Sequence, residues 1–323
     1  MFFNLFATGS SGRGPSAANP RMKNEQPITS KTTERGTLNV SNMTSYGFSG
    51  MQGWRVTMED AHIMSSPIPV HKRKPLQGHA LFGVMDGHGG GFTSMYASQH
   101  FVETFSSQPQ LKDYSQMRDK DKYSVPGVEL LKAALSKTFE VLDTDIRKQQ
   151  NMMNDKLIAL SAKKGDDCNI RYERSGSTCI VVLVTPNHII CANSGDSRAI
   201  MRRDGKTLPL SFDHKPTDIS ELERITAADG IVKNKRVDGD LAVSRGLGDF
   251  TYKSNESKTL AEQKVVPYPD FVVYPRNHEK DEFMVIACDG IFDVSTNEQC
   301  STFVQELLDE GENDIGMICE EAM

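Results

Sequence analysis

Apolar runs of strand length alternate along this chain with longer segments of helical spacing. The runs that predict buried strands cover residues 80–85, 175–185, 188–192, 271–274 and 283–287. Pro186 and Asn187 separate the second run from the third and predict a β-hairpin there. Helices are predicted over residues 92–105, 128–150, 217–228 and 297–308, and the polar segment 106–126 is predicted to be a loop. Alternating strands and helices with a hairpin do not by themselves fix the architecture.

The first 45 residues differ in composition from the rest. From residue 8 onward they are rich in Ser, Gly, Thr, Asn and Pro, so we predict a disordered leader over residues 1–45 and a folded domain over residues 46–323. Residues 1–7 are apolar but shorter than a typical secretory core, and Phe2 stands where N-myristoylation needs glycine. Because no apolar run approaches the ~18 residues needed to cross a bilayer, we expect no membrane span.

Charge and cysteine content argue against a nucleic-acid-binding protein and against a disulfide-stabilised one. The 323 residues carry a net charge of −6, which lacks the basic excess of a nucleic-acid binder. The basic run at residues 71–74 falls in a predicted loop and is expected to be solvated. The six cysteines form no CxxC pair and several lie in apolar runs, a pattern typical of buried thiols in a reducing compartment. We therefore expect a cytoplasmic or nuclear monomer.

Several carboxylates stand at or near the ends of predicted strands, most of them beside glycine. They are Glu59-Asp60, Asp86 before Gly87, Asp196 after Gly195, Asp249 after Gly248 and Asp289 before Gly290. Each alone is equally consistent with a turn or a helix cap. Together they would repel unless cations compensate them, and oxygen ligands in a glycine-rich frame suit Mg²⁺ or Mn²⁺. Two such ions can activate water for in-line displacement at phosphorus.

Two further residues fit that chemistry. Arg55, four residues before Glu59, could fork two phosphoryl oxygens, although a surface ion pair with Glu59 or Asp60 is the plain alternative. His88, two residues after Asp86, could protonate a leaving alkoxide, although a turn histidine bonded to backbone is the plain alternative. The sequence thus indicates a candidate site for phosphoester chemistry.

Six motifs follow one another in an order that resembles a known family. They are GWRVTMED (53–60), LFGVMDGHGG (81–90), SGSTCIVVLV (175–184), CANSGDSRA (191–199), LAVSRGLGD (241–249) and IACDGIFDV (286–294). This order is similar to that of the metal-dependent serine/threonine protein phosphatases of type 2C, and the similarity extends from residue 46 to the end. The resemblance implies an α+β fold, a four-layer α-β-β-α sandwich of two mainly antiparallel sheets flanked by helices.

The resemblance also implies a set of metal ligands. Asp86 would bridge two ions, the Gly87 carbonyl would bind one of them and Asp289 the other. Glu59 would hold a metal directly or through water, with Asp60 beside it. A weaker third metal site would comprise Asp196, Asp289 and Asp293.

The remaining roles concern the substrate. By resemblance, Arg55 would bind the substrate phosphate, His88 would be the general acid, and Arg236 would lie near the peptide. Asp249 matches a motif that the family uses structurally, so we do not expect it to be a ligand. The implied function is hydrolysis of phosphoserine and phosphothreonine in phosphoproteins, by metal-activated water at a binuclear Mg²⁺ or Mn²⁺ centre and without a covalent intermediate.

The chain departs from the family pattern at its end. The family closes with an Asp-Asn motif on a final strand, and the sequence stops at Met323, several residues short of it. We therefore expect a missing C-terminal strand, an unpaired neighbour in the sheet and weakened metal affinity, saturating only in the millimolar range. The alternative function is a catalytically impaired scaffold of the same fold that binds phosphoproteins. Hydrolysis of small phosphoesters is less favoured, because no nucleotide-binding GxxxxGK[ST] loop is present.

Overall fold

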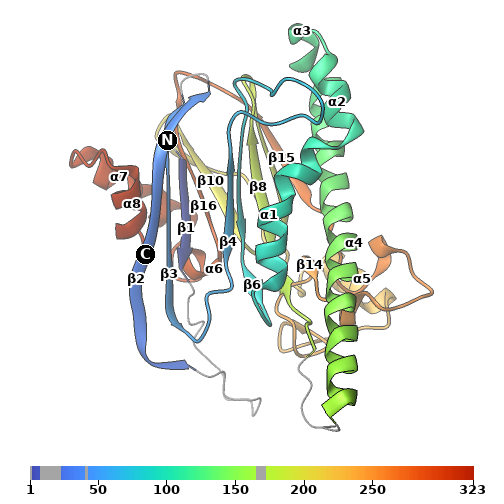
Figure 1. Cartoon of the computed structure of the whole chain (residues 1–323). Coiled ribbons are helices and arrows are strands. Elements are labelled where there is room, and N and C mark those ends of the chain that lie inside the picture. The colour runs from blue at the N-terminus through green and yellow to red at the C-terminus, as the bar shows by residue number, and fades with distance from the viewer. Residues whose placement is uncertain (1, 8–22, 41–42, 165–171) are drawn as a thin grey trace.

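Two β-sheets stand face to face between two groups of helices in the computed structural model, which describes residues 2–7, 23–40, 43–164 and 172–323 (Figure 1). The six-stranded sheet has the order β11 (Lys206–Pro209), β10 (Arg198–Arg203), β16 (Asp281–Ala287), β1 (Phe2–Ala7), β3 (Met43–Arg55) and β2 (Lys23–Val40). The five-stranded sheet is antiparallel throughout, in the order β15 (Asp270–Pro275), β9 (His188–Ser194), β8 (Cys179–Val184), β5 (Ala80–Met85) and β4 (Ala61–Ser65).

Helices cover the outer face of each sheet. Figure 1 shows the five-stranded sheet covered by α1 (Phe92–Ser106), α2 (Pro109–Gln116) and α4 (Val125–Lys164), with α3 (Asp119–Lys122) beyond its end. The six-stranded sheet is covered by α6 (Asp289–Phe292), α7 (Asn297–Asp309) and α8 (Ile315–Glu321). Among the helices in the described ranges, none is long and apolar enough to cross a membrane.

The side-chain alternation of the central strands produces the layers. In β5, Ala80, Phe82 and Val84 pack between the two sheets, whereas Leu81 and Met85 face α1 and α4. The same alternation in β16 divides its apolar residues between the layer inside the sandwich and the layer under α6–α8. The predicted four-layer α-β-β-α sandwich is therefore confirmed.

Short strands link this sandwich to the loops. β6 (Gly87–His88), β7 (Gly176–Ser177) and β14 (Leu247–Gly248) form a small sheet in the order β14-β7-β6. A hairpin of β12 (Val232–Lys233) and β13 (Arg236–Val237) follows α5 (Ile219–Ala227). Two 3₁₀ turns, Phe250–Lys253 and Leu260–Glu262, complete the segment before β15. The small sheet brings three loops, distant in sequence, to one end of the sandwich.

The N-terminal region differs from the predicted disordered leader. Lys23–Val40 forms β2, antiparallel to β3, and Phe2–Ala7 forms β1, parallel to both β3 and β16. Residues 8–22 lie outside the described part of the chain. β2 lies at an edge of its sheet, where polar residues remain solvated, so its polar composition does not prevent strand formation. β16 is paired on both of its sides, with β10 on one and β1 on the other.

The helical region before β7 also extends beyond the prediction. The segment 106–126, predicted to be a loop, contains α2 and α3, and α2 buries Leu111 and Tyr114. α4 spans 40 residues rather than the predicted 128–150. Among the side chains of α4 that the structure describes, the buried apolar ones end at Ile146, so the hydrophobic period that predicts a helix stops well before the helix does.

Candidate metal centre and active site

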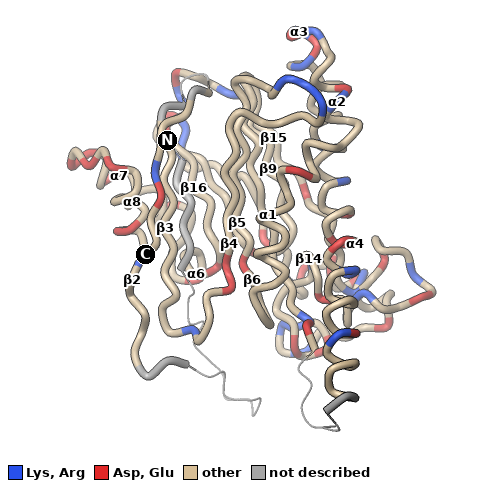
Figure 2. The backbone as a smooth tube through the Cα atoms, viewed as in Figure 1, with Lys and Arg blue, Asp and Glu red and all other residues tan. Residues whose placement is uncertain are grey.

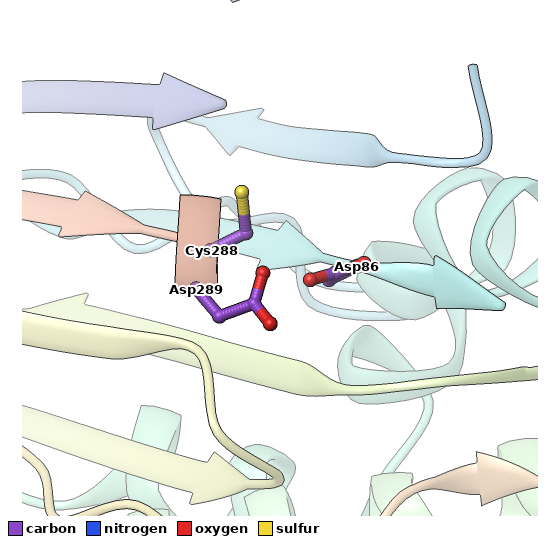
Figure 3. A group of neighbouring side chains, drawn as sticks. All are labelled: Asp86, Cys288 and Asp289. Carbon is purple, nitrogen blue, oxygen red and sulfur yellow. The ribbon is translucent and has the colours of Figure 1, made fainter. Parts of the chain in front are cut away.

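Three carboxylates from separate segments meet at one end of the sandwich. Asp86 directly follows β5, Asp289 begins α6 directly after β16 and Cys288, and Asp60 directly precedes β4. The potential ligand atoms of Asp86, Cys288 and Asp289 all lie within 4.8 Å of one another. Figure 3 shows the carboxylates of Asp86 and Asp289 directed toward each other, with the Cys288 thiol standing apart from them. The thiol donates to Asp60 Oδ2 at 3.8 Å, which connects the third carboxylate to the group.

Burial and mutual repulsion alter the acidity of these groups. Burial, and then the nearby charge of Asp289, raise the pKa of Asp60 to about 7. Burial and the charge of Asp196 raise the pKa of Asp289 to about 6. The pKa of Asp86 is raised well above its usual value by burial and by Asp60 and Asp289, and Asp86 shares a hydrogen bond with Asp60. Without a cation, this cluster holds protons near neutral pH.

The donor chemistry fits a hard divalent cation. The converging donors are carboxylate oxygens, and burial raises the pKa of the Cys288 thiol far enough to keep it protonated. A protonated thiol is a poor metal ligand, whereas carboxylates are the ligands that hard cations prefer. We name Asp60, Asp86 and Asp289 the acidic cluster.

Gly87 permits a close backbone approach beside the acidic cluster. A Cβ atom at this position would lie 2.2 Å from the Glu59 carbonyl oxygen, so a side chain cannot be accommodated without displacing that segment. The Ser94 hydroxyl donates to the same carbonyl oxygen. The Glu59 carboxylate accepts from Thr57 Oγ1 at 2.8 Å, and its charge also acts on His88. The predicted ligand Glu59 is thus anchored next to Gly87 by its backbone, with its carboxylate near His88.

His88 is paired with a carboxylate rather than with backbone. Its Nε2 lies 2.9 and 2.8 Å from the two carboxylate oxygens of Asp249. The side chain of His88 is 32% exposed, whereas that of Asp249 is 5% exposed. Burial opposes protonation of His88, but the charge and hydrogen bond of Asp249 together with the charges of Asp196 and Glu59 outweigh it, so the pKa of His88 is raised. The turn interpretation, in which His88 bonds only to backbone, does not describe this contact.

The predicted third metal site contains a protein cation. Asp196 is buried, and its Oδ2 lies 2.7 Å from Nζ of Lys215. Burial disfavours the charged form of Lys215, but the charge and hydrogen bond of Asp196 together with the charges of Asp213 and Asp289 outweigh burial, so the pKa of Lys215 is raised. Asp293, which is exposed, donates its backbone N–H to the Asp289 carbonyl oxygen at 2.7 Å. Both Asp196 and Asp293 act electrostatically on Asp289, and the Lys215 ammonium, which sequence reasoning missed, lowers the pKa of Asp289.

The two predicted substrate arginines occupy different surroundings. Arg55 ends β3, and its charge lowers the pKa of both Asp60 and Asp289, which places it beside the acidic cluster. Arg236 begins β13 and donates to the Asp240 carbonyl oxygen at 2.5 Å within its own loop. Arg55 therefore acts on the acidic cluster, whereas the hydrogen bond of Arg236 stays within its own loop.

Comparison with known proteins is consistent with this geometry. A family model of protein phosphatase 2C matches residues 44–323. Protein phosphatase 1B of Rattus norvegicus is 37% identical over 290 residues, which are 90% of this chain and 68% of that protein. The chain belongs to the protein phosphatase 2C family. The members of this family are metal-dependent serine/threonine phosphatases, so the chain is a protein phosphatase of the 2C type.

Other members of the 2C family show the same relationship. Human protein phosphatase 1A is 37% identical over 278 residues, covering 86% of this chain and 65% of that protein. Protein phosphatase 2C homolog 2 of Saccharomyces cerevisiae is 34% identical over 288 residues, covering 88% of this chain and 54% of that protein. The crystal structure of serine-threonine phosphatase 2C from Toxoplasma gondii shares the fold with a TM-score of 0.66 at 20% identity, covering 94% of this chain and 92% of that chain.

A buried ion pair fixes the loop that carries Asp249 in this 2C phosphatase. Lys253 Nζ lies 2.6 Å from Asp143 Oδ1, and both side chains are almost fully buried. Asp143, on α4, also accepts from the Gly248 backbone N–H at 2.9 Å, and Lys253 donates to the Gly246 carbonyl oxygen at 2.8 Å. The backbone at Gly248 and Asp249 is left-handed, with φ of +76° and +54°. This ion pair therefore holds the left-handed backbone of Asp249, which is unfavourable for a residue other than glycine and presents its carboxylate to His88.

Proposed function

We propose that this chain hydrolyses phosphoserine and phosphothreonine in proteins, with Mg²⁺ or Mn²⁺ bound at the acidic cluster. The observation that carries the proposal is the convergence of buried carboxylates whose pKa values are raised to about 7 for Asp60 and about 6 for Asp289. Such a cluster is costly without compensating charge, and divalent cations would replace its protons at neutral pH.

The residues of the cluster would share two ions. Asp86, which interacts with both Asp60 and Asp289, would hold the ions together with these two carboxylates. The Gly87 carbonyl and Glu59 would complete the set next to it. When bound, the ions would lower the pKa of a water molecule to supply the nucleophile and would offset charge on the phosphoryl oxygens.

The protein's own residues would orient the phosphate and supply a proton. Arg55, whose charge acts on two members of the acidic cluster, would hold the phosphate dianion. His88 uses Nε2 to bond Asp249, so Nδ1 is the ring nitrogen left to donate a proton to the leaving oxygen. Asp249 supports that role in two ways, because it fixes the ring orientation and favours the charged imidazolium.

Phosphate release from a phosphothreonine peptide tests the proposal. The protein is first stripped of metal with a chelator, and the assay is then run without metal, with Mg²⁺ and with Mn²⁺. We expect release only when a divalent ion is added. Peptide binding without phosphate release under every condition would favour the phosphoprotein-binding scaffold, and undiminished turnover after metal removal would overturn the mechanism.

A further inference from the structure

A second concave site lies away from the acidic cluster. It is a cavity of about 1120 Å³ between the β4–β5 loop and the α2–α3 segment. Its lining includes Lys72, Arg73 and Lys74 from the loop and Ser115, Lys122 and Tyr123 from the helical side. Figure 2 shows the basic loop as a continuous blue stretch beside α2. We call this site the basic pocket.

The basic pocket and the acidic cluster lie at opposite ends of β5. His79, which lines the pocket, directly precedes this strand, and Asp86 directly follows it. Seven residues of extended chain at ~3.3 Å each place the two sites about 20 Å apart. A phosphate bound at the acidic cluster therefore cannot also contact the pocket.

The floor and the loop of the pocket are ordered by internal hydrogen bonds. His79 Nδ1 lies 2.9 Å from the Gln77 carbonyl oxygen and must donate to it, so Nε2 accepts from the Tyr114 hydroxyl at 2.9 Å. Burial lowers the pKa of His79 to about 4, so this floor is neutral. In the loop, the Arg73 N–H donates to the Val70 carbonyl oxygen at 3.0 Å, and Leu76 N–H donates to Ile68 at 2.8 Å. The basic loop is therefore held in place by backbone hydrogen bonds, next to a pocket floor that carries no charge.

The positive charge of the pocket is largely uncompensated. Lys72, Arg73 and Lys74 are exposed, and their side chains make no hydrogen bond or ion pair with any residue in the described ranges. Lys122, in contrast, is paired with Asp119 at 3.0 Å. Three free cations therefore face one cavity on a chain whose net charge is −6. Such a local concentration of charge attracts anions despite the overall acidity.

We propose that the basic pocket docks an acidic segment of the phosphoprotein substrate, remote from its phosphorylated residue. The three cations are consecutive on one exposed loop, and consecutive acidic residues of an extended peptide present their charges at similar intervals. A small polyanion is usually held instead by donors that converge from several sides. Pro75, Tyr123 and Pro186 add apolar surface for a peptide chain. That the segment belongs to a substrate rests on the proposed function.

Binding without turnover tests the pocket independently of catalysis. The probe is a fluorescein-labelled oligoglutamate peptide without phosphate, followed by anisotropy at low salt. Replacing three exposed cations (Lys72→Gln, Arg73→Gln, Lys74→Gln) is expected to weaken binding about tenfold, because each exposed ion pair contributes a modest share. A matched variant (Lys137→Gln, Lys148→Gln, Lys206→Gln) removes the same charge from exposed positions elsewhere and should bind like the wild type.

Three binding results would overturn the proposal. One is equal affinity of the pocket variant and the wild type. A second is equal weakening in the matched variant, which would show that net charge alone determines binding. The third is displacement of the probe by inositol hexakisphosphate at concentrations far below those of unlabelled oligoglutamate, which would identify a small polyanion as the occupant. Because the probe carries no phosphate, these results do not depend on phosphatase activity.

Peptide spacing tests whether docking serves catalysis. Two phosphothreonine peptides carry the same acidic tail, one after a 3-residue linker and one after a flexible 15-residue linker. Three residues span at most ~11 Å and cannot reach across about 20 Å, whereas 15 flexible residues have a typical span of about 20 Å. We expect a KM about fivefold lower for the long linker in the wild type, at unchanged kcat, and no such difference in the pocket variant. Equal KM values for both linkers in the wild type, or an advantage that survives in the pocket variant, would exclude the docking role.

Discussion

The acidic cluster and the buried carboxylate of Glu221 have opposite electrostatic character. In the acidic cluster, burial and like charges raise the pKa of Asp60 to about 7. At Glu221, which is 1% exposed, Arg245 and Arg224 outweigh burial and lower the pKa to about 2. The Glu221 carboxylate is 2.8 Å from the guanidinium of each arginine, and Arg245 extends the network to Asp270 at 2.7 Å. The two sites differ because the chain places two arginines against Glu221, whereas the acidic cluster lacks enough positive charge to offset its carboxylates.

The charges around Glu221 are balanced by residues of the chain, whereas those of the acidic cluster are not. Arg224 also donates to the Ser244 carbonyl oxygen at 2.6 Å, so the Glu221 network ties α5 to the loop that precedes β14. Its charges are balanced within the fold. At the acidic cluster, Arg55 compensates only part of the repulsion, since the pKa values of Asp60 and Asp289 remain raised. Removing a carboxylate should therefore impair stability at Glu221 and catalysis at the acidic cluster.

The largest effect is expected for Asp86→Asn. The substitution keeps the shape of the side chain but removes the charge from the centre of the acidic cluster, so we expect kcat to fall by roughly a thousandfold. Stability of the metal-free protein should not decrease, because a repulsive group is lost. Phosphate release and thermal unfolding measure the two effects, with Glu221→Gln as the control that keeps its kcat. Near wild-type turnover in Asp86→Asn would make Asp86 a turn residue only.

Glu221→Gln should produce the opposite pattern. The folded pKa of about 2 lies below the ordinary value of 4.5, so this carboxylate contributes stability above pH 4.5 that is lost as pH falls toward 2. The full contribution is about 3 kcal/mol by linkage. Urea unfolding between pH 7 and pH 3 should show a lower stability at pH 7 in the variant and a shallower loss on acidification. Parallel pH curves for the two proteins would contradict the assigned pairing.

Asp249 tests an intermediate case, a buried carboxylate whose partner is an imidazole. Asp249→Asn should slow alkyl phosphate esters about thirtyfold, while p-nitrophenyl phosphate, whose leaving group needs no proton, should be slowed much less. His88→Gln should show the same selectivity, and the double variant should be no slower than either single one. Equal slowing of both substrate types would assign Asp249 a purely structural role.

The sequence pattern predicted those features of the molecule that depend on residues close together in the chain. Alternation in β5 and the glycine after Asp86 anticipated both the central strand and the carboxylate at its end, because burial and turn geometry act over a few residues. Lys215 and the pairing of His88 with Asp249 escaped prediction, since 161 residues separate the members of that pair. Gly248-Asp249 did carry a signal, a carboxylate after glycine, and it was assigned to structure. The strand β2 was missed because composition indicates disorder without showing whether a sheet edge is available.

The smallest expected effect is the stabilisation of the fold by metal. If the acidic cluster receives cations from solution, Mg²⁺ or Mn²⁺ at a hundred times its Kd should add about 2.7 kcal/mol and raise Tm by a few degrees, roughly 3–5 °C. Asp289→Asn should reduce the increment, whereas Glu221→Gln should show the full increment from a lower starting Tm, because its charges are already balanced by arginines. Differential scanning calorimetry with increasing metal measures both. An undiminished increment in Asp289→Asn would place the stabilising ions elsewhere and remove the distinction between the acidic cluster and Glu221.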